Sequence, residues 1–339
     1  MTICAFKLEN FGPITQVSGQ NLGKLNLIIG KNSTGKTYLL KALYSLIRTQ
    51  EEAGKGDDPR LLSEVLADKL YWTFQNEKLG DLVTKGAGKL SASINMATNK
   101  RMSFEFGVDT TKKINAVKNN TLTRQANSIF LPPKEILSLQ KVILKSALQD
   151  RVFGFDSTYV DLALALQSPT LRGRNFEAFS TSRTKLEAMF TGKVTYNTDK
   201  GQWQYKQGNK VFSIHATAEG VKKIAILDTL LGNRYLTPES VIFIDEPESA
   251  LHPKAIVEFL DIIKLLSDVG IQFFMATHSY FVIKKLYLIA LQYKISIPVF
   301  ISDNDGWQQK NLLNGIPDNE IINESIRLFD KELEVAFNG

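Results

Sequence analysis

The feature that most constrains this chain is the segment G-K-N-S-T-G-K-T at residues 30–37. It follows an apolar run at residues 25–29 and precedes a helical pattern at residues 38–43. Strand, loop and helix thus stand in the order that a phosphate-binding P-loop requires. Glycines let backbone N–H groups approach a phosphate closely, and the helix presents its positive end to the anion. The segment therefore predicts a nucleotide-binding site.

Within this segment the last two residues have roles of their own. Lys36 is predicted to bring a positive charge to the β- and γ-phosphates, and the Thr37 hydroxyl is predicted to reach Mg²⁺ from the first helical turn. The residues predicted to bind the nucleotide are Gly30, Lys31, Asn32, Ser33, Thr34, Gly35, Lys36 and Thr37.

A pair of acidic residues follows a second apolar run far downstream, where residues 241–244 precede Asp245 and Glu246. Such a run is typical of a buried parallel strand that ends at the ligand-binding edge of a sheet. Asp245 is predicted to hold Mg²⁺, and Glu246 to polarise the water that attacks the γ-phosphate. Because more than half of the chain separates Thr37 from Asp245, we expect a large insertion between them.

A histidine follows a third apolar run, at residues 271–276. His278 is therefore predicted to lie at the carboxyl end of a neighbouring parallel strand, where it is placed to donate a hydrogen bond to the γ-phosphate. The predicted catalytic residues are Glu246, His278 and Lys36.

These motifs resemble those of ABC-type P-loop ATPases of the RecF/SMC/OLD branch, in which OLD stands for overcoming lysogenization defect. The segments D-E-P-E at 245–248, L-H-P at 251–253 and T-H-S at 277–279 are similar to the Walker B motif, D-loop and His-switch. The opening at 6–14 looks like the first strand of this branch. The end of the chain, from residue 314, resembles stand-alone AAA family ATP-binding proteins of bacterial phage-defence or toxin–antitoxin-like gene pairs.

The resemblance implies a signature loop, through which one subunit caps the ATP held by the other. Its counterpart is A-T-A-E-G-V-K-K at residues 216–223, where Ala218 replaces the usual serine. Thr217, Glu219 and Gly220 are the residues expected to contact the nucleotide of a partner subunit.

The Q-loop of the family has no clear counterpart. The strand and prolines at residues 129–135 occupy its expected place but contain no glutamine. Lys134 and Glu135 are both candidates for its role, and a solvated turn is an equally open interpretation.

The implied fold is α/β, an ABC-type P-loop NTPase with a mixed or parallel central sheet, an antiparallel N-terminal sheet and an inserted α+β lobe. The ATPase body is expected at residues 1–48 and 211–339, and the lobe at residues 49–210. Periodicity within the lobe predicts helices at 58–74 and 137–166, antiparallel strands at 90–96 and 102–108, and a hairpin at 193–205.

Composition indicates where such a protein works. The single cysteine, Cys4, excludes an intrachain disulfide, and no apolar run is typical of a signal peptide or a membrane span. We therefore expect a cytoplasmic protein without membrane contact. The net charge of +6 makes nucleic acid a candidate partner, although a solvated basic surface explains the same excess.

The preferred function is an ATPase that uses ATP and Mg²⁺, forms a nucleotide-sandwich homodimer, and gates a separate effector such as a nuclease or toxin, in phage defence. Ala218 predicts slow turnover without the partner. The ATPase subunit of a membrane transporter is an alternative, although an aromatic A-loop and a Q-loop glutamine are missing. A non-hydrolysing ATP switch is another alternative, against which Glu246 argues.

Overall fold

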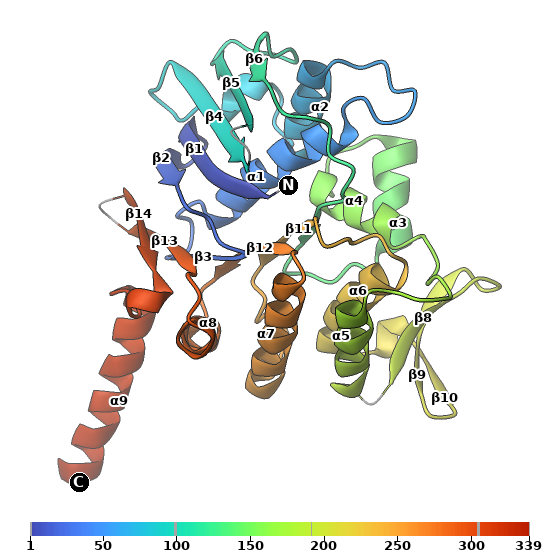
Figure 1. Cartoon of the computed structure of the whole chain (residues 1–339), viewed down its shortest axis with the longest axis vertical. Coiled ribbons are helices and arrows are strands. Elements are labelled where there is room, and N and C mark those ends of the chain that lie inside the picture. Colours follow the sequence, from blue (N-terminus) through green and yellow to red (C-terminus); the bar gives the residue numbers. More distant parts are fainter. Residues whose placement is uncertain (1, 98–99, 191, 304–305, 339) are drawn as a thin grey trace.

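The structure is a computed structural model that describes residues 2–97, 100–190, 192–303 and 306–338, and its elements are labelled in Figure 1. At its centre is a six-stranded sheet in the order β14-β13-β3-β12-β11-β7. The pairings from β13 to β7 are parallel, and β14 runs antiparallel to β13. The strands are β3 (Leu25–Gly30), β7 (Ile129–Leu131), β11 (Val241–Asp245), β12 (Gln272–Thr277), β13 (Pro298–Asp303) and β14 (Gly306–Asn311).

The central strands form where the sequence is most continuously apolar. Every residue of β3, β11 and β12 is buried, as expected for parallel strands covered on both faces. This confirms the strands predicted at residues 25–29, 241–244 and 271–276. Their carboxyl ends meet at one edge of the sheet, which brings together the segments that follow them.

A five-stranded antiparallel sheet, in the order β2-β1-β4-β5-β6, lies over the central sheet. Helix α1 (Lys36–Glu52) lies between the two sheets, and its apolar side chains share one core with residues of both. In β5, buried residues alternate with more exposed ones, so one face of the strand packs inward. The strands are β1 (Ile3–Phe11), β2 (Ile14–Gly19), β4 (Lys89–Met96), β5 (Lys100–Gly107) and β6 (Ala116–Asn119).

This pairing differs from the division predicted from the sequence. The strands predicted at 90–96 and 102–108 exist, but β4 pairs with β1 over six residue pairs, so both strands extend the N-terminal sheet. Likewise β7 pairs with β11 at the edge of the central sheet. Strands from the segment 49–210 thus pair with strands on both sides of it in the sequence, while the division into body and lobe stays a prediction. Local periodicity does not report such pairing between distant strands.

Helices cover the other face of the central sheet, below it in Figure 1. They are α5 (Glu177–Ala188), α6 (Glu219–Gly232), α7 (Pro253–Asp268) and α8 (Tyr280–Tyr293). The predicted hairpin is confirmed and gains a third strand, which gives a small sheet of β8 (Lys193–Asn197), β9 (Gln202–Gln207) and β10 (Lys210–Ser213). Short 3₁₀ segments occur at Leu79–Leu82, Ile214–Ala216 and Leu312–Asn314.

The helix predicted at 58–74 is α2 (Leu62–Phe74), whereas the one predicted at 137–166 is interrupted. It is divided into α3 (Gln140–Leu144), a π-helical turn (Lys145–Asp150) and α4 (Ser157–Ala165). The break follows from two local features. Arg151 takes a left-handed conformation with φ of 51°, and the Asp156 side chain accepts a hydrogen bond from the Thr158 N–H, which starts a new helix.

The last helix, α9 (Glu320–Asn338), extends away from the body, with the C-terminus at its far tip (Figure 1). Among the described residues, no helix combines the length and the apolar character that a membrane span requires.

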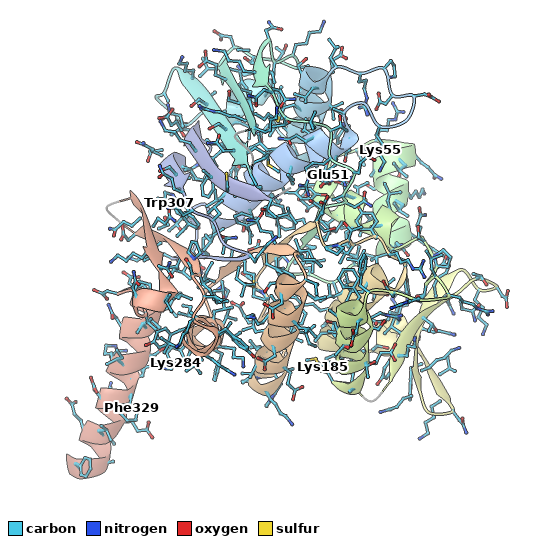
Figure 2. All side chains as sticks on the ribbon, in the orientation of Figure 1. Glu51, Lys55, Lys185, Lys284, Trp307 and Phe329 are labelled. Atoms are coloured by element: carbon cyan, nitrogen blue, oxygen red, sulfur yellow. The ribbon has the colours of Figure 1, made fainter. Side chains whose placement is uncertain are left out.

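Charged side chains are buried where α1 meets the segment before β7. Glu51, labelled in Figure 2, is buried, and its carboxylate accepts hydrogen bonds from Arg48 Nη1 at 3.1 Å and Arg124 Nε at 3.2 Å. It also accepts from the backbone N–H of Ser128 at 2.8 Å and from its hydroxyl at 2.6 Å. Two cations and a hydroxyl thus compensate one buried carboxylate, because an uncompensated charge here would be costly.

We expect Glu51→Gln to destabilise the fold by about 3 kcal/mol, because Arg48 and Arg124 would lose a buried partner charge. Urea unfolding, followed by circular dichroism, measures the change. The matched control is Glu105→Gln, which removes a half-exposed carboxylate paired with Lys89 and should cost less than about 1 kcal/mol. Equal losses in the two variants would show that the buried cluster contributes nothing special.

Candidate nucleotide site

The P-loop connects the end of β3 to the start of α1, as the sequence predicts. A Cβ atom at Gly30 would lie 2.6 Å from the Ser302 carbonyl oxygen, so a larger residue would force the loop away from β13. Gly35 precedes α1 with a φ of 93°, a conformation that L side chains rarely adopt. Both glycines are thus required by the local backbone, and the loop between them opens onto the first turn of α1.

Lys36 lies across this loop. Its Nζ donates to the carbonyl oxygens of Gly30 at 2.8 Å and Lys31 at 2.7 Å. Burial lowers the pKa of Lys36, while the nearby carboxylates, Asp245 first among them, act to raise it. A phosphate in the loop would accept hydrogen bonds from Lys36 Nζ in place of these two carbonyl oxygens, as the predicted role of Lys36 requires.

The two predicted magnesium ligands are in direct contact. The Thr37 hydroxyl donates to Asp245 Oδ2 at 2.7 Å, across one intervening strand of the sheet. Burial raises the pKa of Asp245, and the hydrogen bond from Thr37 opposes that rise. The sheet order therefore brings a hydroxyl and a carboxylate, which are both oxygen ligands suited to Mg²⁺, to one point.

Glu246 and His278 lie together at the same edge. Glu246 has a φ of 52°, and its N–H donates to the Ala276 carbonyl oxygen at 2.9 Å, so the chain turns sharply after β11. The half-exposed imidazole of His278 places Nδ1 3.6 Å from Glu246 Oε1 and 3.8 Å from Glu248 Oε1. The structure thus groups the two residues predicted to act on the γ-phosphate.

Glu248 has a role that the sequence did not reveal. Its Oε1 accepts hydrogen bonds from the Thr277 hydroxyl at 2.7 Å and the His278 N–H at 3.2 Å. It therefore fixes the backbone that carries the histidine. The D-E-P-E segment already contained this residue, but nothing in its spacing showed which strand it would contact.

Lys223 is a second residue that the sequence did not single out. Its Nζ donates to the backbone carbonyl of Glu246, and burial lowers its pKa to about 8 against the influence of Glu248, Glu246 and Asp245. A helix before β11 thus contacts the turn after it, where Glu246 lies. Only the packing of α6 reveals this contact, because lysines in the first turns of a helix are usually solvated.

The predicted signature loop, residues 216–223, leads into α6 and lies against the segment that follows Asp245 and Glu246 in the sequence. A Cβ at Gly220 would lie 2.7 Å from the Ala250 carbonyl oxygen, so glycine permits this close approach. Thr217 differs from expectation, because it is buried and its hydroxyl donates to the Ser213 carbonyl at 2.9 Å. Its side chain is therefore used within its own chain. Glu219 is exposed, and it pairs with Lys222 at 2.8 Å.

The candidate Q-loop segment contacts the same helix. Glu135 accepts a hydrogen bond from Lys222 Nζ at 3.1 Å, whereas Lys134 is exposed. Of the two residues considered for this segment, Glu135 is thus the one that joins it to α6.

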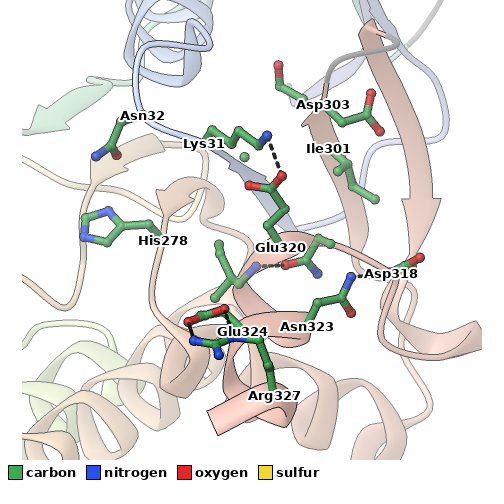
Figure 3. A pocket seen from close by; sticks show the side chains of 14 residues that line it. Lys31, Asn32, His278, Ile301, Asp303, Asp318, Glu320, Asn323, Glu324 and Arg327 are labelled. Carbon is green, nitrogen blue, oxygen red and sulfur yellow. Dashed lines mark hydrogen bonds and ion pairs between the residues drawn. The ribbon is translucent and has the colours of Figure 1, made fainter.

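A cavity of about 860 Å³ lies beside the P-loop, between Gly30 to Asn32 and the start of α9. Figure 3 shows His278 and Lys31 on one side and Glu320 on the other, with Lys31 and Glu320 joined by an ion pair. Because neither Lys36 nor Thr37 lines it, the cavity adjoins the predicted phosphate site without containing it.

Comparison with known proteins matches two family models to separate parts of the chain. A model described as "AAA ATPase domain" matches residues 1–130, and one described as "AAA domain, putative AbiEii toxin, Type IV TA system" matches residues 163–284. The first contains the P-loop, and the second contains the acidic pair and His278. A search of curated proteins found no significant match.

Solved structures with the same fold include heads of SMC proteins. One is an SMC head bound to the C-winged helix domain of ScpA, with 14% identity, coverage of 92% of this chain and 97% of that chain, and a TM-score of 0.56. Another is an SMC head with an extended coiled coil, bound to the C-terminal domain of ScpA from Pyrococcus furiosus, with 12% identity, coverage of 97% and 98%, and a TM-score of 0.53. At such identities the likeness concerns the fold, and it confirms the α/β ABC-type architecture.

Lys223 gives the stability of the chain a distinct pH dependence. Its folded-state pKa of about 8 lies below the ordinary value of 10.5, so the unfolded chain binds more protons between these values. This residue therefore makes the free energy of unfolding rise with pH over that window. We expect Lys223→Met to remove this rise in urea unfolding without nucleotide, whereas Lys254→Met, at an exposed site, should keep it. Parallel curves for Lys223→Met and the wild-type chain would contradict the assignment.

Proposed function

We propose that this chain, which matches two AAA ATPase family models and has the fold of SMC heads, hydrolyses Mg²⁺-bound ATP and uses the closure of two copies to gate a separate effector protein. The observation that carries the proposal is the meeting of Thr37, Asp245 and Glu246 at one edge of the sheet, directly beside the P-loop. These residues come from distant parts of the chain, and hydrolysis of a nucleotide is the reaction that requires them together.

The side chains present fit ATP and magnesium. The P-loop residues would hold the phosphates, with Lys36 on the β- and γ-phosphates, and Thr37 and Asp245 would hold the ion. Magnesium, when bound, supplies positive charge that stabilises the phosphate oxygens. The contact between Thr37 and Asp245 supports this assignment, because both ligands already point to one place.

For hydrolysis, Glu246 accepts a proton from the attacking water, and His278 donates a hydrogen bond to the γ-phosphate. Two positioning residues support them. Glu248 holds the backbone of His278, and Lys223 holds the backbone carbonyl of Glu246. Because Lys223 belongs to α6, a movement of α6 would displace Glu246, which links the signature helix to catalysis.

The second half of the active site comes from a partner copy. In this proposal the start of α6 faces the ATP of the other subunit, and Gly220 and the free N–H groups of that helix contact its phosphate. Ala218 offers no hydroxyl, and that of Thr217 is used internally. We therefore expect weaker ATP-driven dimerisation and slower hydrolysis than a serine at this position would give.

The effector is proposed to be a separate protein, a nuclease or a toxin, and the setting to be phage defence. Two comparisons support a partner of this kind. The second family model is described by a toxin–antitoxin system, and the SMC heads of similar fold were solved bound to domains of another protein, ScpA. Nucleic acid is a further candidate ligand, on the net charge of +6.

Glu246→Gln is expected to bind ATP and to reduce hydrolysis at least about 100-fold, because the amide does not accept the proton. Light scattering after size exclusion should then show a higher mass with ATP and Mg²⁺ than without them. Glu258→Gln, on the outer side of α7, serves as the matched control and should hydrolyse ATP normally. Hydrolysis at the native rate in Glu246→Gln would show that another group is the base.

Lys36→Ala is expected to weaken ATP binding at least about 10-fold, since it removes the charge that meets the β- and γ-phosphates. Fluorescence titration with a labelled ATP analogue measures this loss. Lys41→Ala, on the next turn of α1 and paired with Asp156, tests whether any nearby lysine would have the same effect. Intact affinity in Lys36→Ala would refute the phosphate site.

A further inference from the structure

Helix α9 exposes an apolar surface that no other described residue covers. Its start packs on the body, where Ile321 and Ile322 are partly buried against the core that includes α8. Beyond them Phe329, labelled in Figure 2, is 58% exposed, and the helix continues into solvent. In proteins most helical stability comes from the packing of an amphipathic face, so this exposed apolar face points to a partner.

The exposed residues Leu328 and Val335 lie on another side of α9, but most of its other apolar residues form one stripe. They recur at intervals of four and three residues, which is the spacing of a helix that packs lengthwise against another helix. This stripe, the α9 seam, consists of Ile322, Ile326, Phe329, Leu333 and Ala336. Its helix is acidic, with five acidic and two basic side chains, although the whole chain has a net charge of +6.

Helix α8 exposes a stripe with matching chemistry. Its outer face repeats at intervals of three and four residues, and its members, the α8 seam, are Phe281, Lys284, Leu288 and Leu291. The helix contains Lys284 and Lys285 and no acidic residue. Lys285 pairs with Asp261 of α7, whereas Lys284 lies 5.6 Å from the ring centre of Tyr287, on the outer side. Apolar spacing and charge on α8 therefore complement those on α9.

We propose that the α9 seam of one chain packs on the α8 seam of a second copy, and reciprocally, to form a two-fold dimer that does not need nucleotide. Two acidic α9 helices side by side would bring like charges together, whereas α9 against α8 joins opposite charges. Because α9 projects from the body, it is available to another molecule. The contact is separate from the ATP-dependent closure, since it uses the helices outside the P-loop and α6.

The test is the mass of the nucleotide-free Lys36→Ala chain at about 50 µM, by light scattering after size exclusion. This background removes ATP-driven association, so the proposal predicts a dimer there. Leu333→Glu, in the α9 seam, and Leu288→Glu, in the α8 seam, should each shift the protein to monomer. The matched control is Leu328→Glu, an exposed leucine on another side of α9, which should leave the dimer intact.

The outcomes distinguish the proposed dimer from other partners of the α9 seam. If the Lys36→Ala chain without a seam substitution is a monomer, the proposal is overturned. The α9 seam would then be left to a different protein or to the chain's own α8. Loss of the dimer in Leu333→Glu but not in Leu288→Glu would mean that α9 pairs with α9, which also overturns it. Thermal unfolding of each variant, within about 3 °C of the background, shows that a monomer has not arisen from misfolding.

Discussion

The hydrogen bond between Thr37 and Asp245 is the contact on which the candidate site depends, because it joins the two distant segments that form the predicted nucleotide site. It forms only if β12 lies between β3 and β11, since that order brings the P-loop, the acidic pair and His278 to one edge. The buried strands supply this order through apolar side chains on both faces. Folding and function therefore share one cause, the packing of the parallel sheet around α1.

Helix α1 connects the site to the rest of the molecule. Its first residues belong to the predicted phosphate site, Lys41 pairs with Asp156 at the start of α4, and Glu51 near its end accepts hydrogen bonds from Arg124 and Ser128. Helix α6 makes a second connection through Lys223 and Lys222. A change of position at the nucleotide thus has two physical routes to the segments between the two site halves, both built of buried or half-buried charge.

The sequence predicted the strands that lead into the candidate site better than it predicted how distant strands pair. The P-loop, the strand of Asp245 and the strand of His278 have local patterns that leave few alternatives, and the fold they imply is confirmed. Their assigned roles stay predictions. The pairing of β4 with β1 was not predicted because it is a long-range contact, and Lys223 and Glu248 were missed because their contacts depend on packing between elements. Thr217 lies at the position that the motif predicts, but its hydroxyl donates a hydrogen bond to the Ser213 carbonyl of its own chain.

The measurement that tests the central claim most directly is the affinity for ATP with and without Mg²⁺, by calorimetry, in the wild-type chain and in Asp245→Asn. If Thr37 and Asp245 hold the ion beside the P-loop, magnesium should tighten binding to the wild-type chain and have little effect on the variant. An equal effect of magnesium on both proteins would contradict the account, because the ion would then be held elsewhere.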